Sequence, residues 1–377
     1  MNVVVTGIGL LCCLGSLSES WQNLLARRSG IRLQRPFPEL PAYPLGLIGK
    51  SPTQLTKLTR LVLSAALEDG RLTTPLPDCG VVIGSSRGCQ AVWEQYASQL
   101  HGDRDSLQLE NWLETLPNQG AIAAARQIGT TAIVLAPMAA CATGIWAIAQ
   151  AFELIQQGKC QRVIAGAIEA PVTPLTLAGF QQMGALAATG CYPFDKHREG
   201  LVLGEGAAIL VLESAELALS RGAAIYGQIL GFGLTCDATH ISAPSIDNRS
   251  ATIAVKDCLE RSNLSATEID YIHAHGTSTK LNDAREASLV QSLFPHGVAV
   301  SSTKGATGHT LGASGAIGAA FCLMALKRQE FPTCVGLKES EFQLNLVTAP
   351  RRGEIRQAMC FSFGFGGQNA VIALGKF

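Results

Sequence analysis

The chain has 377 residues, of which 47% are hydrophobic and 15% are charged, and 39 are glycines. This composition excludes an intrinsically disordered chain and predicts a globular protein with a substantial buried core. Lys plus Arg and Asp plus Glu each total 29, so the chain has no net charge that would hold nucleic acid or an anionic membrane surface.

The first residues, MNVVVTGIGLLCCLG, read as a strand and not as a secretory signal, because no basic segment precedes the apolar one. The longest apolar stretch, residues 316–326, is too short to cross a bilayer. The twelve cysteines include no C-x-x-C pair with metal-ligand spacing. We therefore expect reduced, buried thiols in a cytoplasmic protein.

Short runs of β-branched residues alternate with longer helical patterns along the chain. Residues 3–5, 81–83 and 163–164 are typical of buried parallel strands, with helices between them. An α/β fold class is predicted. Because no polar linker interrupts the chain, we expect an intimate division after the strand predicted at 207–213, giving one half at 1–214 and another at 215–377.

Cys141 lies between a predicted strand, 131–135, and a predicted helix that begins at Ala142. The free N–H groups and positive dipole of a helix N-terminus favour a thiolate, so we expect a lowered thiol pKa and a nucleophilic sulfur. The alternative is a small residue that only fills space, because free cysteine is commonly buried and inert.

Three of the seven histidines lie in two segments that follow predicted strands. His273 and His275 occur in YIHAHGTST, and His309 ends SSTKGATGH. Histidine beside glycine after a strand often faces a cleft, so both loops are predicted to converge on the cysteine. His273 and His275 would share one face of a strand, but without a third ligand this spacing is weak evidence for zinc, and no metal is predicted.

A faint internal repeat involves two helices rich in Ala and Gly. Cys141 opens one of them and Gly312 opens the other, about half a chain later. Small side chains let two helix backbones approach closely, as central helices buried between two sheets must. The repeat predicts two similar halves around a shared core.

A series of short motifs occurs in order along nearly the whole chain. They are VVVTGIG from residue 3, ACATG from 140, PFDKHREG from 193, GEGA from 204, AHGTST from 274 with Asn282 and Asp283, Lys304 with Gly308 and His309, and SFGFGGQN from 362. Together they resemble the elongating β-ketoacyl-acyl-carrier-protein synthases. The resemblance implies a thiolase-like, five-layered αβαβα fold of two similar halves, and a homodimer whose interface helps to shape the acyl pocket.

The resemblance also implies roles for individual catalytic residues. Cys141 would carry the acyl chain as a thioester, in an oxyanion hole made by its own N–H and that of Phe365. His275 and His309 would bind the malonyl thioester carbonyl and stabilise the enolate charge that develops on loss of carbon dioxide. Lys304 would complete the catalytic set.

Further residues are implied to hold the substrate. Thr277 and Thr279 would hydrogen-bond the pantetheine arm, with loop capping as the alternative. Phe365 would act as a gate between the acyl pocket and the malonyl site, and Asp283 and Glu286 would support the loop. No resident cofactor is implied, because the 4'-phosphopantetheine arrives on the implied partner, an acidic acyl carrier protein. Candidate contacts for this partner, with a solvated surface as the alternative for each, are Arg27, Arg28, Lys57 and Arg60.

Several positions depart from the family pattern. Gly318 stands where a glutamate usually pairs with Lys304, and Glu286 is a possible substitute. His273 stands where glutamate is usual, and Gly184 where arginine is usual. The segment 87–117 is shorter and different, which leaves the acyl chain length open.

The leading hypothesis is a decarboxylative Claisen condensation of an acyl thioester with malonyl-acyl-carrier protein, in fatty-acid elongation or in a specialised polyketide or lipid pathway. One alternative is a non-catalytic ketosynthase-like subunit that sets chain length in a heterodimer, although such subunits typically lose the cysteine. Another is a thiolase, which does not decarboxylate and would need a second cysteine at the position of His309.

Overall fold

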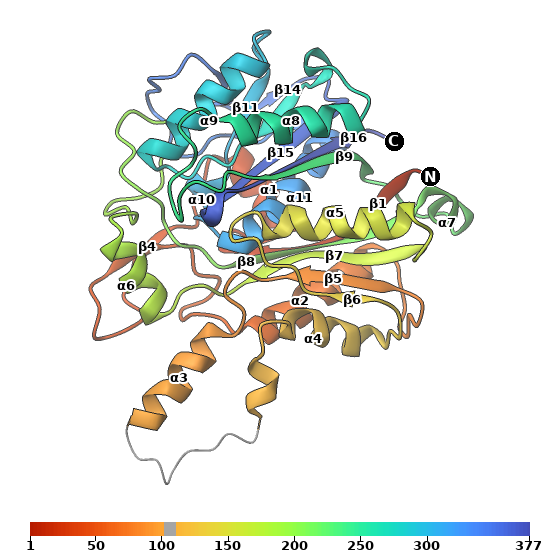
Figure 1. Cartoon of the computed structure of the whole chain (residues 1–377), viewed down its shortest axis with the longest axis horizontal. Helices are drawn as coiled ribbons and strands as arrows, with labels where there is room; N and C mark the ends of the chain where they lie inside the picture. Colours follow the sequence, from red (N-terminus) through yellow and green to blue (C-terminus); the bar gives the residue numbers. More distant parts are fainter. Residues whose placement is uncertain (102–110) are drawn as a thin grey trace.

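The structure, a computed structural model, describes residues 1–101 and 111–377. Figure 1 shows helices and sheets stacked in five layers: two outer helix layers, two sheets and one central helix layer between the sheets. The predicted α/β class and the five-layered αβαβα arrangement are confirmed.

The sheet of the first half has the order β6-β5-β7-β8-β1. Strands β6, β5 and β7 are parallel, whereas β8 runs antiparallel to both β7 and β1. The strands are β1 (Val3–Cys12), β5 (Gly80–Gly84), β6 (Val134–Leu135), β7 (Arg162–Glu169) and β8 (Gly206–Ser214). The strand predicted at 131–135 is thus shorter than expected.

The sheet of the second half repeats this order and polarity, with one additional strand, β13, at its edge, as β13-β11-β10-β15-β16-β9. Strands β11, β10 and β15 are parallel, and β16 runs antiparallel to both β15 and β9. The strands are β9 (Gly227–Cys236), β10 (Tyr271–His273), β11 (Ala299–Ser301), β13 (Asn345–Leu346), β15 (Gln357–Gly364) and β16 (Gln368–Gly375). The predicted pair of similar halves is confirmed.

The first strands of the two halves also pair with each other, because residues 3–5 of β1 lie antiparallel to residues 227–229 of β9. Strand β8 ends at Ser214, and helix α7 (Ala215–Ser220) leads from it toward β9. The division of the chain after residue 214 stays a prediction.

Two helices form the central layer, α5 (Thr143–Gln156) and α11 (Ser314–Arg328). Helices α2 (Leu55–Asp69) and α4 (Gln119–Ile128) cover the outer face of the first sheet, and α8 (Arg249–Arg261) and α9 (Lys280–Leu293) cover that of the second. Helix α2 is amphipathic in the expected way, because its buried residues recur three and four apart.

The remaining elements connect these layers or lie at their ends. They are β2 (Gly15–Ser16), α1 (Leu17–Leu25), β3 (Arg32–Gln34), β4 (Tyr43–Leu45), α3 (Gln90–His101), η2 (Trp112–Thr115), α6 (Pro174–Gln182), η3 (Ala266–Glu268), α10 (Lys304–Thr307), η4 (Leu311–Ala313), β12 (Glu330–Phe331), β14 (Arg351–Arg352) and η5 (Phe365–Gly367). Helix α3 projects away from the five layers (Figure 1). Part of the segment 87–117, predicted to differ from the family, lies outside the described residues.

The central helices pack through small residues. A Cβ atom added to Gly144 in α5 would lie 2.5 Å from the backbone nitrogen of Ala316 in α11, and one added to Gly315 would lie 2.9 Å from Ile145. Among the described residues, one helical segment, 311–328, is long and apolar enough to cross a membrane by length and composition, but 89% of it is buried inside the protein. It is therefore a core helix of this fold.

This contact predicts a specific sensitivity at Gly144. Replacement by Ala should lower the free energy of unfolding by about 1–3 kcal/mol, because the new methyl group overpacks against the backbone of α11. Urea unfolding followed by circular dichroism measures this. Gly179→Ala in α6 is the matched control, because nothing lies within 4 Å of its added Cβ, and it should be neutral or slightly stabilising. Equal behaviour of the two variants would contradict close packing of α5 on α11.

Candidate active site

Cys141 lies in the tight connection that enters α5. Ala140 has a φ of 47°, and Ala142 is the N-cap residue of the helix. The hydroxyl of Ser362, at the end of β15, donates to the carbonyl oxygen of Cys141 at 2.8 Å. The cysteine therefore stands at a helix N-terminus, held in place from the other half of the chain.

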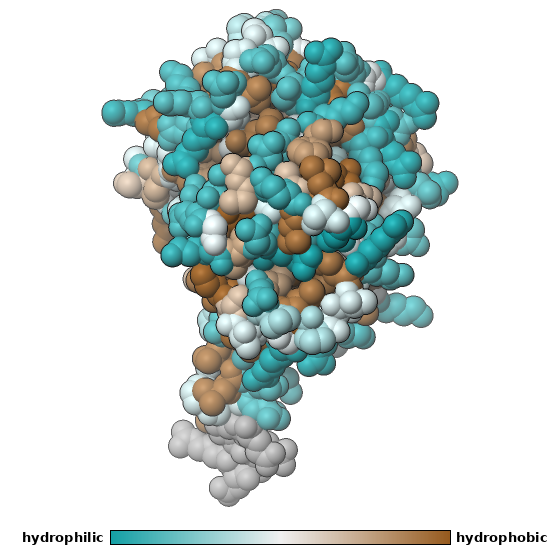
Figure 2. Space-filling model, turned by 90° about the vertical axis from the view of Figure 1, so that its right-hand side faces the viewer, coloured by the Kyte–Doolittle hydropathy of each residue, from teal (hydrophilic) through white to brown (hydrophobic). Residues whose placement is uncertain are grey.

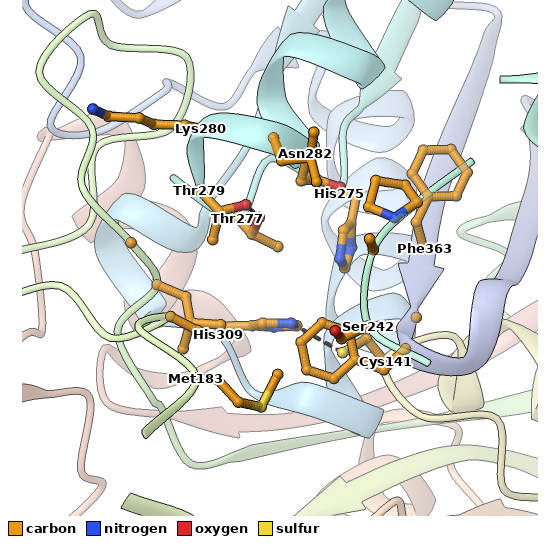
Figure 3. Close-up of a pocket in the computed structure, with 18 of the residues that line it drawn as sticks. Cys141, Met183, Ser242, His275, Thr277, Thr279, Lys280, Asn282, His309 and Phe363 are labelled. Atoms are coloured by element: carbon orange, nitrogen blue, oxygen red, sulfur yellow. Dashed lines mark hydrogen bonds between the residues drawn. The ribbon is translucent and has the colours of Figure 1, made fainter. Parts of the chain in front are cut away.

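His309 contacts this sulfur directly. Its Nε2 atom lies 3.1 Å from Sγ of Cys141 (Figure 3). Its backbone is fixed between residues of the first half, since its N–H donates to the Val202 carbonyl at 2.6 Å and its own carbonyl accepts from Gly204 at 3.0 Å. The imidazole is 1% exposed.

His275, in the loop after β10, completes a compact group. Its ring centroid lies 5.3 Å from that of His309, with the rings nearly perpendicular. Ligand-type atoms of Cys141, His275 and His309 all lie within 4.8 Å of one another. The structure thus brings together the three side chains on which the sequence analysis depends.

One thiol and two imidazoles are also donors that Zn²⁺ accepts. The pair considered for zinc in the sequence, His273 with His275, does not form the group, because the ring of His273 instead approaches Thr303 and Cys360. The absence of a functional metal stays a prediction.

Burial dominates the electrostatics of the cysteine. It raises the pKa of the Cys141 thiol to about 11, and the smaller effects of Lys304, Arg87 and the N–H of Phe365 act in the opposite direction without reversing it. The expectation of a lowered thiol pKa is therefore wrong in direction. The cost of placing a thiolate in this buried position exceeds the stabilisation that its surroundings provide, so the thiol stays neutral near neutral pH.

The two imidazoles are neutral for the same reason. Burial, and then the positive charge of Lys304, hold the pKa of both His275 and His309 well below the usual value. In the described part of the chain, Nδ1 of each ring is buried without a hydrogen-bond partner. The resting site is consequently a neutral thiol beside a neutral imidazole, a pair between which a proton can pass.

Lys304 binds the backbone of the loop that carries His275. Its ammonium group donates to the carbonyl oxygen of His275, and burial lowers its pKa although Glu286 raises it. No carboxylate of the described residues lies within 4 Å of the ammonium group. The hypothesis that Glu286 replaces the missing ion-pair partner is therefore wrong for direct pairing.

Glu286 and Asp283 stabilise the same loop through its backbone. Glu286 accepts from the N–H groups of His275 at 2.5 Å and Gly276 at 2.6 Å. Asp283 accepts from the N–H groups of Phe194 at 2.8 Å and Ser278 at 3.2 Å. Both carboxylates are buried, and burial raises their pKa values to about 7 for Glu286 and about 6 for Asp283. They position the histidine loop and do not face the sulfur.

A cavity of about 390 Å³ opens above the three side chains (Figure 3). Thr277 and Thr279, whose hydroxyl oxygens are 2.9 Å apart, line it together with Lys280 and Asn282. Phe365 lines this cavity and a second one that also reaches Cys141. Its ring stacks on Phe180 with centroids 6.0 Å apart. Phe365 is thus placed between two approaches to the sulfur.

Two family models match the chain, Beta-ketoacyl synthase, N-terminal domain over residues 46–218 and Beta-ketoacyl synthase, C-terminal domain over residues 226–338. The 3-oxoacyl-[acyl-carrier-protein] synthase 2 of Synechocystis is 35% identical over all of this chain and 98% of its own length. The protein of the same name from Staphylococcus aureus is 32% identical over all of this chain and 99% of its own length. The chain belongs to the β-ketoacyl synthase family.

Solved structures agree with this β-ketoacyl synthase fold. A ketosynthase of a type II polyketide synthase, solved with its acyl-carrier protein, matches with a TM-score of 0.94 at 26% identity, covering all of this chain and 99% of that one. A β-ketoacyl synthase from Burkholderia phymatum matches with a TM-score of 0.91 at 28% identity and the same coverage. The predicted thiolase-like fold is confirmed.

Two departures of this β-ketoacyl synthase from the family pattern are neighbours in space. A Cβ added to Gly318 would lie 2.7 Å from Nδ1 of His273 and 2.7 Å from Sγ of Cys360. Nε2 of His273 lies 3.0 Å from the hydroxyl oxygen of Thr303, the N-cap residue of the helix that begins with Lys304. The imidazole thus occupies space that the glycine leaves free, and it contacts the segment that holds the lysine.

The third departure, Gly184, lies in the wall of the main cavity. Its φ is +64° and nothing lies within 4 Å of an added Cβ. The family usually has an arginine at this position. Glycine leaves open space in the cavity wall where that side chain would be.

Sequence analysis missed Glu169, which has no exposed surface. Its carboxylate accepts from the hydroxyl of Ser85 at 2.8 Å, from the N–H of Arg87 at 3.0 Å and from the N–H of Gly312 at 2.9 Å. It therefore fixes a loop of the first half to the start of the α11 region. The available signal was a single acid at the end of the apolar strand VIAGAIE.

The raised thiol pKa predicts the pH dependence of alkylation at Cys141. The thiol is neutral below a pKa of about 11, so thiolate is gained only as the pH rises. The rate of iodoacetamide modification should increase about tenfold for each pH unit from about pH 7 to about pH 10. Peptide mass spectrometry of Cys141 measures it, with N-acetylcysteine as reference. A rate that is already constant near neutral pH would contradict the neutral-thiol state.

The neighbouring departures predict a coupled effect on stability. Gly318→Ala should lower the free energy of unfolding by about 1–3 kcal/mol, because the methyl group overlaps the imidazole of His273. In a His273→Ala background the same change should be less harmful, although the contact of the methyl group with Sγ of Cys360 remains. Urea unfolding of the two single variants and the double variant gives the coupling energy. Additive losses would mean that His273 does not depend on the space at Gly318.

Proposed function

We propose that this β-ketoacyl synthase condenses an acyl group carried on Cys141 with malonyl-acyl-carrier protein, releasing carbon dioxide and 3-ketoacyl-acyl-carrier protein. The observation that supports this best is the sulfur of Cys141 at 3.1 Å from a neutral imidazole, with a second neutral imidazole in the same small group. A buried thiol needs a neighbouring base, and a developing enolate needs neutral N–H donors.

The first half-reaction loads the cysteine. Nε2 of His309 accepts the thiol proton as the sulfur attacks the carbonyl carbon of the incoming acyl thioester. The tetrahedral oxyanion is stabilised by the N–H groups of Cys141 and Phe365. Its collapse breaks the bond to the carrier thiol, which takes the proton from His309. The acyl chain is then bound to Cys141, and the imidazole is neutral again.

The second half-reaction forms the carbon–carbon bond. The acylated sulfur no longer donates a proton to Nε2 of His309. Once the ring proton of His309 has moved from Nδ1 to Nε2 by exchange with water in the cavity, His309 and His275 both present N–H groups to the malonyl thioester carbonyl. Breaking the bond to the malonyl carboxylate releases carbon dioxide and leaves the electron pair as an enolate. The enolate carbon attacks the acyl carbonyl, and the sulfur of Cys141 leaves as a thiolate that takes up a proton from solvent.

Lys304 assists these steps without contacting the reacting atoms. Burial first, and then the positive charge of Lys304 close to the histidine loop, keep both imidazoles unprotonated, and neutral donors do not trap the malonyl carboxylate that must leave. Thr277 and Thr279 hold the pantetheine arm from the cavity wall. No resident cofactor is proposed, since the phosphopantetheine belongs to the carrier protein. A cytoplasmic location and the pathway, fatty-acid or specialised, stay predictions.

Reconstitution with acyl- and malonyl-loaded carrier protein tests the function. The protein should form 3-ketoacyl product and carbon dioxide in equal amounts, and Cys141→Ala should lower the rate by at least ~10³-fold, because the covalent intermediate is lost. Cys160→Ala is the matched control and should retain activity, because Cys160 lies in the connection between α5 and β7 and lines neither cavity that reaches Cys141. Unchanged output of Cys141→Ala in an assembled system would favour the non-catalytic partner role, and product without malonyl substrate would favour a thiolase.

The carrier protein is proposed to dock at the cavity entrance. None of Arg27, Arg28, Lys57 and Arg60 lines the cavity, whereas exposed Lys280 does. Lys280→Glu should raise the KM for acyl-carrier protein about tenfold, because a like charge then faces the acidic partner. The KM for the same acyl group on free pantetheine should not change. Lys57→Glu is the control, and an equal effect of both variants would contradict this docking place.

A homodimer is proposed from the exposed apolar surface. Figure 2 shows hydrophobic residues on the narrow projection that carries α3. Trp93, Trp112 and Leu113 are each at least 43% exposed there, and Met138 beside the Cys141 loop is 68% exposed. Strand β6 ends its sheet within the described part of the chain. Such a surface is typical of an interface, and sedimentation velocity will show whether a second copy covers it.

A further inference from the structure

A second cavity, of about 380 Å³, reaches Cys141 without touching either catalytic histidine. It shares Phe180 and Phe365 with the first cavity. Because the histidines face the malonyl side, this second cavity is the space available to the acyl chain on the sulfur. Its wall is formed by Ser86, Arg87, Met138, Ala139, Ala140, Phe180, Leu311, Phe365 and Gln368.

An arginine stands in this otherwise largely apolar wall. The guanidinium carbon of Arg87 lies 5.7 Å from the ring centroid of Phe180, and the same ring stacks on Phe365. The backbone N–H of Arg87 donates to the buried carboxylate of Glu169 at 3.0 Å, which fixes the base of the side chain. The arginine is therefore positioned on the wall that leads away from Cys141.

The charge of Arg87 is not used within the described part of the chain. No carboxylate there lies within 4 Å of its guanidinium group, and no side chain accepts a hydrogen bond from it. The five N–H donors of the guanidinium group consequently remain for water or for a bound molecule. The neighbouring Ser86 and Gln368 add further polar atoms to the wall.

These donors discriminate between kinds of acyl chain. A saturated chain that packs beside the guanidinium group removes water from it and returns no hydrogen bond, which is unfavourable. A carboxylate or carbonyl oxygen on the chain replaces that water, and a carboxylate can do so with two parallel bonds. The difference favours oxygen-bearing chains over alkyl chains of the same length.

We propose that the acyl chain extended by this protein carries an acceptor oxygen, as a carboxylate or a carbonyl group, at its distal end, and that Arg87 recognises it. The inference rests on the proposed condensation and names its acyl substrate class. Arg87 acts here as a specificity-determining residue that touches the substrate tail and not the reacting atoms.

The test compares matched acyl groups on the carrier protein: hexanoyl with adipoyl, and octanoyl with suberoyl. For the native protein, kcat/KM for condensation should be about three- to fivefold higher with the carboxylate-ended member of each pair, because the carboxylate gains charge-assisted hydrogen bonds from Arg87, whose exposed position in the described part of the chain leaves the pair partly screened by water. In Arg87→Leu the preference should reverse toward the alkyl member. Arg60→Leu, an exposed arginine of α2, should leave the native ratio unchanged.

The methyl ester of the adipoyl group separates the two acceptor chemistries. Preference for both ester and carboxylate means recognition of any acceptor oxygen, and preference for the carboxylate alone means recognition of charge; both results support the proposal. Equal or faster extension of the alkyl member, with no change in Arg87→Leu, would overturn it. Intact-protein mass spectrometry separates failure of this proposal from failure of the condensation itself. If the protein does not catalyse the condensation, none of the acyl groups will be carried on Cys141 and extended.

Discussion

The active site depends on the close contact between the two central helices. Gly144 of α5 and Ala316 of α11 approach so closely that a single Cβ has no room at Gly144. Cys141 lies just before α5, and His309 lies just before the short helix that leads into α11. When the small residues of these helices meet, the sulfur of one half and the imidazole of the other are brought to 3.1 Å. Bulky residues at this contact would move the two ends apart, so the repeat of small residues that joins the halves also assembles the chemistry.

Burial, more than any single charge, sets the protonation state of this site. Desolvation is the largest effect on Cys141, His275, His309 and Lys304 alike, and it favours the neutral form of each. The lysine is then the nearest charge and weakens both imidazoles as bases. A neutral thiol next to a neutral imidazole is stable at rest and transfers its proton only when a carbonyl carbon arrives. The carboxylates of Glu286, Asp283 and Glu169 do not face the reacting atoms. They accept hydrogen bonds from backbone N–H groups instead.

Much of the architecture was predictable because it follows from local patterns. Alternating strand and helix patterns predicted the α/β class, and the two Ala- and Gly-rich helices predicted the repeated halves. Cys141 at a strand-to-helix junction, and the histidines beside glycine in loops after strands, predicted their convergence. The sign of the cysteine pKa shift was not predictable, because the helix N-terminus is visible in the sequence whereas the depth of burial is not. The contact between His273 and Gly318, and the place of Arg87 in the cavity that reaches Cys141, depend on how distant segments pack. The motifs identified His273 and Gly318 as unusual and gave no indication of what they touch.

The central claim is that Cys141, one of twelve cysteines, forms the covalent acyl intermediate and that the acyl group is then transferred from its sulfur to the malonyl carbon. Peptide-level mass spectrometry after a single turnover tests this most directly, with acyl-carrier protein added first and malonyl-carrier protein second. The account predicts an acyl adduct confined to the peptide that contains Cys141, and its disappearance together with formation of 3-ketoacyl product once malonyl substrate is added. An adduct on another cysteine, or one on Cys141 that persists after malonyl addition while product forms, would contradict it.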